Sequence, residues 1–343
     1  EIAWSAPAGL PTVLADEGRI RQVLLNLAGN AVKFTDTGGA LLGVEVVSTG
    51  RDRVRLRFTV EDTGPGIAPD EQQRIFQAYA QGSRHAMRAD STGLGLAVVS
   101  RLAEAHQGAV GLESALGQGS SFWFEADFDR YADAPTDRRL WSLRLIVVSQ
   151  NSVLQQGASR QIEALGGVAV TCASIAEAEA LAGDEDVVLV DHALAKSPGV
   201  VRPLKRGACL ILVAPEQRTT IGRYRAAGYA GYLIKPLRAG SLAERTLAVL
   251  GHAVDGLEPT GDERAVVETA PGARVLLVED NSVNALLARK LLEREGCAVD
   301  WVSDGQAAFA AAKLGYDLIL MDRRMPGLDG LQTTARLRLA GVT

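Results

Sequence analysis

Two stretches of the sequence repeat one order of features, and this repeat limits the possible fold more than any other feature of the chain. Short apolar runs at Leu143–Val148 and Arg274–Val278 are each followed by a polar segment that ends in N-S-V. In both stretches a later apolar run ends at an aspartate, Asp191 in one and Asp322 in the other. Strands that alternate with helical patterns favour a parallel, doubly wound sheet. The sequence therefore predicts a duplicated α/β domain.

Two polar stretches without apolar periodicity divide the 343 residues into three predicted domains. They run from Tyr131 to Arg139 and from Asp255 to Gly272, and both contain proline and aspartate. A chain of this length is longer than one hydrophobic core usually supports, which agrees with several domains. We expect domains at residues 1–130, 141–253 and 273–343, with residues 254–272 as a regulatory linker.

The composition excludes several classes of protein. Hydrophobic residues make up 47% and charged residues 22%, which is typical of globular domains. A net charge of -5 argues against a nucleic-acid partner, which would need a basic face. Because no signal peptide or apolar run of about 18 residues is present, we expect a cytoplasmic location and no membrane contact. The cysteines lack C-x-x-C spacing and are predicted to be reduced core residues: Cys172, Cys209 and Cys297.

The first predicted domain contains a helix with a distinctive polar face. Apolar residues in the segment Arg21–Thr35 recur at helical spacing, at Val23, Leu24, Leu27, Ala31 and Val32. This spacing leaves Asn26, Asn30 and Lys33 to share another face. Amide oxygens suit Mg²⁺, and a lysine can offset phosphate charge. Taken alone, the same face could equally be a solvated polar surface.

Two glycine-containing segments follow this helix. The segment Glu61–Ile67, E-D-T-G-P-G-I, comes after a predicted strand, and its glycines permit a tight turn beside a bound ring. Asp62 can then accept a hydrogen bond from an adenine amino group. Farther along, Gly93 and Gly95 precede a helix, where backbone N–H groups favour phosphate.

Together, these three elements resemble the catalytic ATP-binding domain of histidine kinases, an α/β sandwich of the Bergerat fold. The resemblance implies that Asn30 binds Mg²⁺, that Lys33 lies near the phosphates and that Asp62 recognises adenine. Phe76 resembles the F-box of the family, and residues 77–92 correspond to its ATP lid. The ATP-binding residues implied are Asn26, Asn30, Lys33, Asp62, Gly64, Gly66, Thr92, Gly93, Leu94 and Gly95.

The family transfers the γ-phosphoryl group of ATP to a histidine on a helical dimerisation domain that precedes the ATP-binding domain. The four histidines of this chain do not lie in the H-E-x-R context of that family: His85, His106, His192 and His252. We therefore expect the sequence to begin after the dimerisation domain. That missing domain is an expected partner, and the full-length protein is expected to be a homodimer.

Three carboxylates are predicted to converge in the last domain. Glu279 and Asp280 end its first strand and Asp322 ends its third, at the edge of a parallel sheet where α/β folds build sites. Such a cluster can bind Mg²⁺ and leaves Asp322 able to attack a phosphohistidine. The segment M-D-R-R-M-P-G-L-D-G resembles the response-regulator receiver domain, a flavodoxin-like (βα)5 fold. This resemblance implies that Asp322 is phosphorylated and that the carbonyl of Arg324 is a further metal ligand.

The two receiver-like domains depart from the family in different ways. The last ends before the Thr or Ser and the Lys that the family requires, so we expect a truncated receiver. In the middle domain, Ser149 and Gln150 replace the acidic pair and Ala214 replaces the switch residue, whereas Asp191 and Lys235 remain. Without the acidic pair a Mg²⁺ site loses most of its charge, so the middle domain is predicted to be a pseudoreceiver.

The pseudoreceiver also carries a basic cluster with one aromatic residue: Arg218, Arg223, Arg225, Tyr232, Lys235 and Arg238. Arginine binds phosphates bidentately and stacks on purine rings, so this surface suits a dinucleotide. The order R-x13-Y-x-I-x-P-x4-S resembles the pseudoreceiver of the ShkA-like hybrid kinases, whose activating ligand is cyclic di-GMP. The ligand residues implied are Arg218, Tyr232, Ile234, Pro236 and Ser241. A plain spacer or a protein-docking domain is the alternative.

In the linker, Asp262, Glu263 and Arg264 resemble the motif that docks on the pseudoreceiver in that group of kinases. Our hypothesis is that cyclic di-GMP and the linker compete for one surface, so that the ligand shifts the chain toward an open state.

The leading interpretation is an ATP-dependent protein-histidine kinase that passes phosphate from ATP to histidine, then to Asp322 and a downstream histidine phosphotransfer protein. Asn30, Lys33 and Asp322 are its predicted catalytic residues. The alternative is a non-catalytic, nucleotide-binding regulatory module. A gyrase-like or chaperone-like ATPase is disfavoured because receiver-like domains follow directly.

Overall fold

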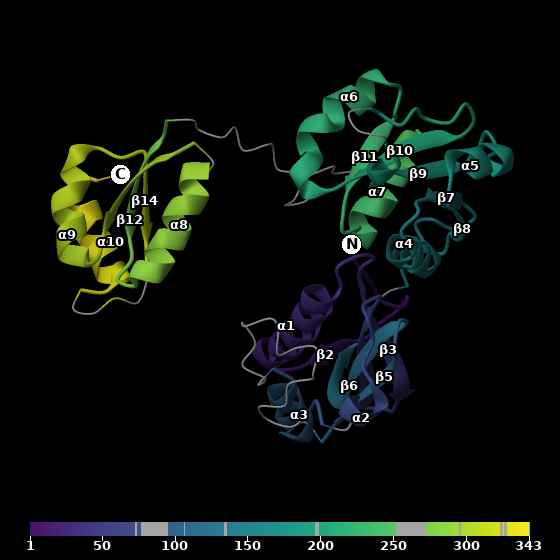
Figure 1. Ribbon diagram of the computed structural model, residues 1–343, viewed down its shortest axis with the longest axis horizontal. Helices are drawn as coiled ribbons and strands as arrows, with labels where there is room; N and C mark the ends of the chain where they lie inside the picture. The colour runs from purple at the N-terminus through teal and green to yellow at the C-terminus, as the bar shows by residue number, and fades with distance from the viewer. Residues whose placement is uncertain are drawn as a thin grey trace. The chain divides into compact units, whose positions relative to one another are not determined.

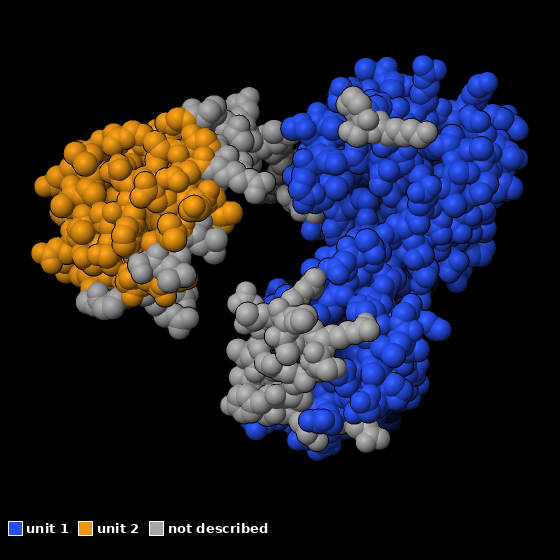
Figure 2. Space-filling view, viewed as in Figure 1, with its two compact units in different colours: residues 1–258 blue, residues 259–343 orange. Residues whose placement is uncertain are grey.

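The computed structural model describes residues 1–72, 74–76, 95–105, 107–133, 136–195, 199–251, 272–294, 296–322, 325 and 328–342. Two compact units divide the chain, residues 1–258 and 259–343 (Figure 2). The first unit contains two sheets and the second unit one, so each of the three predicted domains has a sheet of its own. None of the helices in these described ranges is both long enough and apolar enough to cross a membrane.

The first domain is built on a mixed six-stranded sheet of order β1-β3-β4-β6-β2, with β5 also paired to β6. Its β1–β3 pair is parallel and the other pairs are antiparallel. β6 continues to Ala132, two residues into the stretch predicted to be a linker, because Ala132 pairs with Thr12. The strands are β1 (Ile2–Ser5), β2 (Thr12–Leu14), β3 (Ala40–Thr49), β4 (Arg53–Asp62), β5 (Ala109–Ala115) and β6 (Gly119–Ala132).

Helices α1 (Glu17–Phe34) and α3 (Gly95–Ala105) cover one face of this sheet, and the short α2 (Pro69–Gln72) precedes α3 (Figure 1). The side chain of Asp16 caps α1 by accepting from the Arg19 N–H. Val32 was predicted on the buried face of α1, but it is 53% exposed. Five residues beyond Leu27, it lies about 140° around the helix from that buried side chain.

The middle domain is a parallel five-stranded sheet of order β11-β10-β9-β7-β8. Its strands are β7 (Arg144–Val148), β8 (Val168–Cys172), β9 (Val187–Asp191), β10 (Ala208–Val213) and β11 (Gly231–Ile234). Its helices are α4 (Ser152–Ala164), α5 (Ile175–Leu181), α6 (Ile221–Ala226) and α7 (Ala239–Val249), with 3-10 turns η2 (His192–Leu194) and η3 (Pro215–Thr220). α4 and α7 pack on one face of the sheet and α5 and α6 on the other, which gives two buried cores. This is the predicted doubly wound fold.

The last domain has three parallel strands, in the order β13-β12-β14. They are β12 (Arg274–Val278), β13 (Ala298–Val302) and β14 (Leu318–Met321), with helices α8 (Ser282–Arg294), α9 (Gly305–Ala311) and α10 (Gly330–Leu339) and the 3-10 turn η4 (Ala312–Leu314). The middle domain places its first three strands in the same order, β8-β7-β9. The predicted duplication is therefore confirmed. The three cysteines are free thiols, but Cys297 is only half-buried and so not a core residue.

Candidate functional site

The polar face of α1 meets the first residues of α3. A Cβ built on Gly95 would lie 3.3 Å from Asn26 Oδ1, which places that amide beside the start of α3. Asn26 and Asn30 are both half-buried. Of the predicted phosphate-binding segment, only Gly95 is described, because Thr92, Gly93 and Leu94 lie outside the described residues, as does the predicted lid.

Asp62 ends β4 and is held in place by the turn that follows it. Its carboxylate accepts from the Gly64 N–H at 2.8 Å. Burial raises the pKa of Asp62, and hydrogen bonds from the backbone of Gly64 and Ser120 partly offset this effect. A half-buried carboxylate at this place can accept from an amino group of a bound ring.

Glycines pack tightly around Asp62. Gly66 has a φ of +69°, and a Cβ there would lie 2.0 Å from the carbonyl oxygen of Ala115. Gly119 has a φ of +85°, and its Cβ would lie 1.9 Å from the carbonyl oxygen of Asp62. Only glycine fits both the conformation and the space, as the sequence predicted for Gly66.

The end of α1 lies against the same turn. A Cβ on Gly64 would be 3.0 Å from the Phe34 carbonyl oxygen and 3.2 Å from Thr35 Oγ1. Thr35 Oγ1 is buried and has no hydrogen-bond partner among the described residues. Lys33 Nζ lies 5.7 Å from the centroid of the Phe34 ring. The end of the helix that carries Asn30 and Lys33 is therefore in contact with the turn that follows Asp62.

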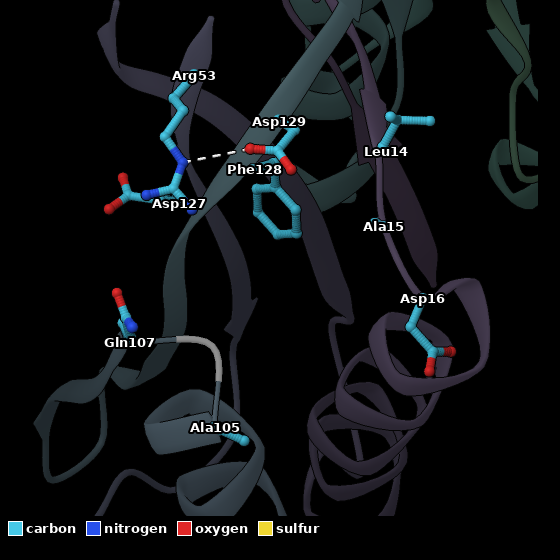
Figure 3. Close-up of a pocket in the computed structure, with 9 residues that line it drawn as sticks. All are labelled: Leu14, Ala15, Asp16, Arg53, Ala105, Gln107, Asp127, Phe128 and Asp129. Carbon is cyan, nitrogen blue, oxygen red and sulfur yellow. Dashed lines mark hydrogen bonds and ion pairs between the residues drawn. The ribbon is translucent and has the colours of Figure 1, made fainter.

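A cavity of about 550 Å³ lies elsewhere in this domain, between β2, β4, β6 and the end of α3 (Figure 3). Arg53 and Asp129 pair across its wall at 3.3 Å. None of the predicted ATP-binding residues that the structure describes lines this cavity. The lining residues are Leu14, Ala15, Asp16, Arg53, Ala105, Gln107, Asp127, Phe128 and Asp129.

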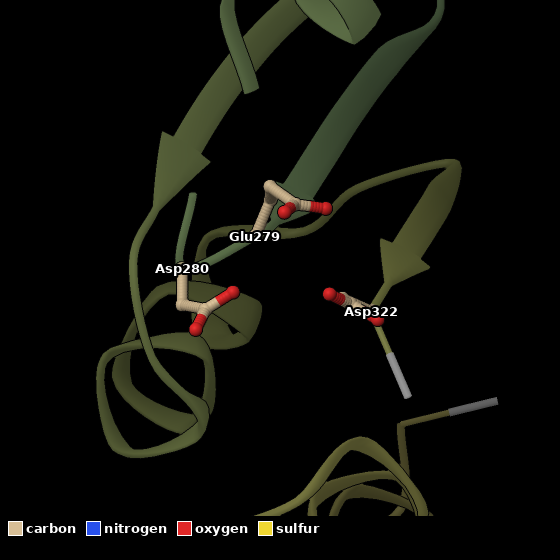
Figure 4. A group of neighbouring side chains, drawn as sticks. All are labelled: Glu279, Asp280 and Asp322. Atoms are coloured by element: carbon tan, nitrogen blue, oxygen red, sulfur yellow. The ribbon is translucent and has the colours of Figure 1, made fainter. Parts of the chain in front are cut away.

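The last domain brings its three predicted carboxylates together (Figure 4). One oxygen from each of Glu279, Asp280 and Asp322 lies within 4.8 Å of the others. Asn284 Nδ2 donates to Glu279 Oε1 at 3.1 Å and orients that side chain. Three converging oxygen donors fit a hard divalent cation such as Mg²⁺. The fourth predicted ligand, the carbonyl of Arg324, lies outside the described residues.

The corresponding aspartate of the middle domain, Asp191, is bound by neighbouring protein groups. Asp191 is 1% exposed and accepts from Ser149 Oγ at 2.6 Å, from Lys235 Nζ at 3.1 Å and from the Ala193 N–H at 3.1 Å. Its carboxylate is therefore satisfied by protein groups. Lys235 was assigned to the exposed basic cluster, and this assignment was wrong. Its side chain is buried in an ion pair with Asp191 at the end of β11.

Two arginine side chains nevertheless lie beside the ring of Tyr232. The guanidinium carbon of Arg225 lies 5.8 Å and that of Arg245 5.1 Å from the centroid of the Tyr232 ring. Arg218 Nε is buried without a hydrogen-bond partner among the described residues. Pro236 is exposed, and Ile234 and Ser241 are half-buried. The sequence prediction missed Arg245, although it lies four residues after Ser241 and hence on the same face of α7.

The remaining predictions concern the histidines and the linker. His192 Nδ1 lies 2.7 Å from Tyr224 Oη, and burial lowers the pKa of His192, so it belongs to the packing of the middle domain. The other three histidines and the linker residues Asp262, Glu263 and Arg264 lie outside the described residues.

Comparisons with known proteins match two parts of the chain to known families. Residues 15–130 match the histidine kinase-, DNA gyrase B-, and HSP90-like ATPase family, and residues 275–342 match the response regulator receiver domain. The crystal structure of full-length ShkA in complex with AMPPNP is 49% identical in sequence to this chain and has a TM-score of 0.70. The match covers 100% of this chain and 70% of the ShkA chain.

Two further relatives cover different shares of the chain. The crystal structure of ShkA Rec1 in complex with c-di-GMP is 41% identical in sequence, with a TM-score of 0.31. That match covers 32% of this chain and 94% of the Rec1 chain. Sensor histidine kinase GacS of Pseudomonas protegens is 29% identical over 95% of this chain. The chain spans 37% of the length of GacS.

Proposed function

Because this chain belongs to the hybrid sensor histidine kinases, we propose that it binds ATP and Mg²⁺, phosphorylates a histidine of a dimerisation domain and transfers the phosphoryl group to Asp322. A histidine phosphotransfer protein then takes the group from Asp322. The observation that carries this proposal is the contact between the C-terminal end of α1 and the Asp62 turn, in the same chain as three converging carboxylates.

At the nucleotide site, the residues of this chain bind and orient ATP. Asp62 accepts from the adenine amino group, and the crowded glycines after it let the ring approach the backbone. Asn30 supplies an oxygen ligand for Mg²⁺, and Lys33 offsets the charge of the phosphates. When bound there, Mg²⁺ would offset charge that develops on the transferred phosphoryl group, and the residues of this chain would contribute by positioning the nucleotide.

At the receiver site, an oxygen of Asp322 attacks the phosphorus of the phosphohistidine. A P–O bond forms as the P–N bond breaks, and the imidazole leaves with its electron pair. Glu279 and Asp280 hold the divalent cation that offsets the charge of the incoming phosphoryl group. Asn284 keeps Glu279 turned toward this place.

A titration of this chain with AMPPNP tests the nucleotide half of the proposal. We expect saturable binding that strengthens in the presence of Mg²⁺, and an Asn30→Ala variant that has lost this Mg²⁺ dependence. The exposed Val32→Ala change, two residues farther along α1, is the matched control and should leave both properties intact. Absence of binding to the folded wild-type chain would contradict the nucleotide half of the proposal.

For the middle domain we propose cyclic di-GMP as the ligand of the Tyr232 surface. The ring of Tyr232 with Arg225 and Arg245 beside it suits a purine. Arg218, whose Nε has no hydrogen-bond partner in the described part of the chain, would bind a phosphate. The linker residues Asp262, Glu263 and Arg264 would compete for this surface, so that the ligand relieves autoinhibition. A domain that serves only as a spacer or a docking module is the competing proposal.

Isothermal titration with cyclic di-GMP separates these two proposals. A sensor binds the ligand saturably and loses binding in both Tyr232→Ala and Arg245→Ala. Tyr131→Ala, at a 71% exposed tyrosine of the first domain, is the control and should bind like the wild type. A chain that binds AMPPNP but not cyclic di-GMP would support the spacer or docking module.

A further inference from the structure

Lys235, the cation paired with Asp191 in the middle domain, also contacts a side chain of the first domain. Lys235 Nζ lies 2.7 Å from Glu1 Oε2 as well as 3.1 Å from Asp191 Oδ1. The side chains of Lys235 and Glu1 are only 10% and 12% exposed. Burial acts to lower the pKa of Lys235, but the charges of Asp191 and Glu1 outweigh it, and the pKa is raised overall. Glu1 thus gives Lys235 a second carboxylate partner, which comes from the first domain.

Apolar packing surrounds this ion pair, because α4 of the middle domain lies against β1 of the first domain. Ala3, Leu41 and Val153 form a small buried cluster that combines both domains. Gly157 lies inside α4, where a Cβ would come within 2.5 Å of the Ala3 Cβ. A glycine weakens a helix interior, and here its missing side chain is what lets the two domains approach.

Polar contacts flank the apolar cluster. Gln161 Nε2 donates to the Trp4 carbonyl oxygen at 2.7 Å and also to the Leu237 carbonyl oxygen at 2.9 Å. Asn151 Nδ2 donates to the Gly38 carbonyl oxygen at 3.0 Å. The contact therefore combines a buried charge, apolar packing and directed hydrogen bonds, as specific interfaces do.

The contact also reaches the residues on both sides of Asp62. Arg160 Nη1 lies 3.5 Å from Glu61 Oε1, which precedes Asp62. On the other side, the Gly39 N–H donates to Thr63 Oγ1 at 2.9 Å, and Asn151 binds the neighbouring Gly38. A cavity of about 440 Å³ lies beside Gly38, Thr63 and Asn151. Its lining residues are Thr37, Gly38, Thr63, Gln150, Asn151, Ser152, Asp191, Ala193 and Leu194.

We propose that the former phosphoacceptor site of the pseudoreceiver is a docking site for the ATP-binding domain, and that docking is coupled to nucleotide binding through the segment Glu61–Thr63. Only the coupling rests on the proposed function, through the assignment of Asp62 to adenine. Docking itself stands on the contacts of Lys235, Gln161 and Gly157.

The groups at this contact are suited to open and close. When the domains separate, Lys235 keeps Asp191 as its partner and Gln161 keeps the Leu237 carbonyl oxygen. Glu1 then moves into water. Breaking a buried ion pair is costly when it leaves one charge buried without a partner. Opening of this contact leaves no such charge. The contact can therefore exist in a docked and an open state, and nucleotide binding at Asp62 and docking at Lys235 can each shift the equilibrium between them.

The Gly157→Leu variant tests docking, because its side chain would have to occupy the place of Ala3. Gly222→Leu in α6 is the matched control, since a Cβ at Gly222 meets nothing within 4 Å. Hydrogen exchange of the whole chain, followed by mass spectrometry, measures protection of the peptides that contain β1 and the Thr37–Gly39 loop. We expect faster exchange of both peptides in Gly157→Leu and wild-type exchange in Gly222→Leu.

Titration of the same two variants with AMPPNP tests the coupling. We expect the affinity of Gly157→Leu to fall by about fivefold or more, and that of Gly222→Leu to stay unchanged. Glu1→Gln, which cannot disturb the packing of α4, should change exchange and affinity in the same directions. Wild-type exchange in a folded Gly157→Leu chain would overturn docking. Faster exchange with unchanged affinity would overturn the coupling, whereas a wild type without nucleotide binding would refute the proposed function and leave docking standing.

Discussion

Lys235 donates to the carboxylate of Asp191 at 3.1 Å, and the two side chains are only 10% and 2% exposed. Asp322, the corresponding aspartate of the last domain, instead lies beside the two acidic side chains of Glu279 and Asp280. Two copies of one fold therefore treat the same strand-end aspartate in opposite ways. One copy neutralises it with protein groups, and the other keeps a cluster of negative charge that a cation can bind.

The ion pair between Lys235 and Asp191 should stabilise the middle domain mainly because neither charge can reach water. Lys235→Met leaves the carboxylate buried without its cation, and we expect a loss of about 3 to 5 kcal/mol in the free energy of unfolding. Adding Asp191→Asn to this variant should recover a large part of that loss. Urea unfolding of the two single variants and the double variant measures this coupling, and strictly additive effects would contradict it.

The raised pKa of Lys235 also sets the pH range of this stabilisation. A lysine whose pKa is higher in the folded state stabilises the fold at all pH values below its unfolded pKa. The contribution is lost as pH rises through the folded pKa. The wild type should therefore lose stability more steeply than Lys235→Met on the alkaline side, with no such difference between pH 6 and 8.

Asp62 is expected to reduce the stability of the free protein and to be needed for its ligand. Burial raises the pKa of Asp62, so the folded state favours the protonated carboxyl. The stabilisation that the protonated carboxyl gives is lost as pH rises through the folded-state pKa. At neutral pH, Asp62→Asn should therefore raise the melting temperature. The same change should weaken AMPPNP binding about tenfold to a hundredfold, because a charge-assisted hydrogen bond is lost. A lower melting temperature together with unchanged affinity would contradict both roles.

Gly66 and Gly117 allow backbone conformation to be separated from crowding near Asp62. Both have positive φ, +69° and +78°, but a Cβ meets a carbonyl oxygen at 2.0 Å in Gly66 and nothing within 4 Å in Gly117. We expect Gly117→Ala to cost about 1 to 2 kcal/mol of unfolding free energy from conformation alone. Gly66→Ala should cost clearly more and also weaken AMPPNP binding. Equal costs for the two variants in thermal unfolding would argue against the crowded turn.

The acidic cluster of the last domain has a natural reporter in Trp301, whose Nε1 donates to the Glu279 carbonyl oxygen at 2.9 Å. We expect Mg²⁺ to change the tryptophan fluorescence of the chain saturably. Asp280→Asn should weaken this response by about tenfold, because a cation ligand has lost its charge. Asp184→Asn is a suitable control, since that carboxylate pairs with Arg206 on the surface of the middle domain. An equal response in both variants would place the cation elsewhere.

The sequence predicted those parts of the molecule that depend on local order along the chain. The duplication followed from the order of strands and aspartates, and the convergence of Glu279, Asp280 and Asp322 followed from the topology of a parallel sheet. The same reasoning placed the Asp62 turn after β4. Each of these predictions needed only the spacing of residues within one domain.

Contacts between distant segments could not be predicted in this way. Lys235 was grouped with exposed basic residues because arginines surround it in the sequence, whereas its partners are Asp191 and Glu1, which is 234 positions away. Gly157 looked like an ordinary helix residue until Ala3 was placed beside it. Arg245 was missed because its relation to Tyr232 depends on how α7 packs on β11.

The flow of phosphate from ATP to Asp322 is tested most directly in the full-length protein with ATP labelled at the γ-phosphate. We predict that the wild type carries label on both histidine and aspartate, and that Asp322→Asn accumulates label that is stable in base and labile in acid, as phosphohistidine is. The Asp191→Asn variant should still carry label on Asp322, because the carboxylate of Asp191 is already bound by Ser149 and Lys235. Label on aspartate that persists in Asp322→Asn, or no label in any of these proteins, would contradict the proposed phosphorelay.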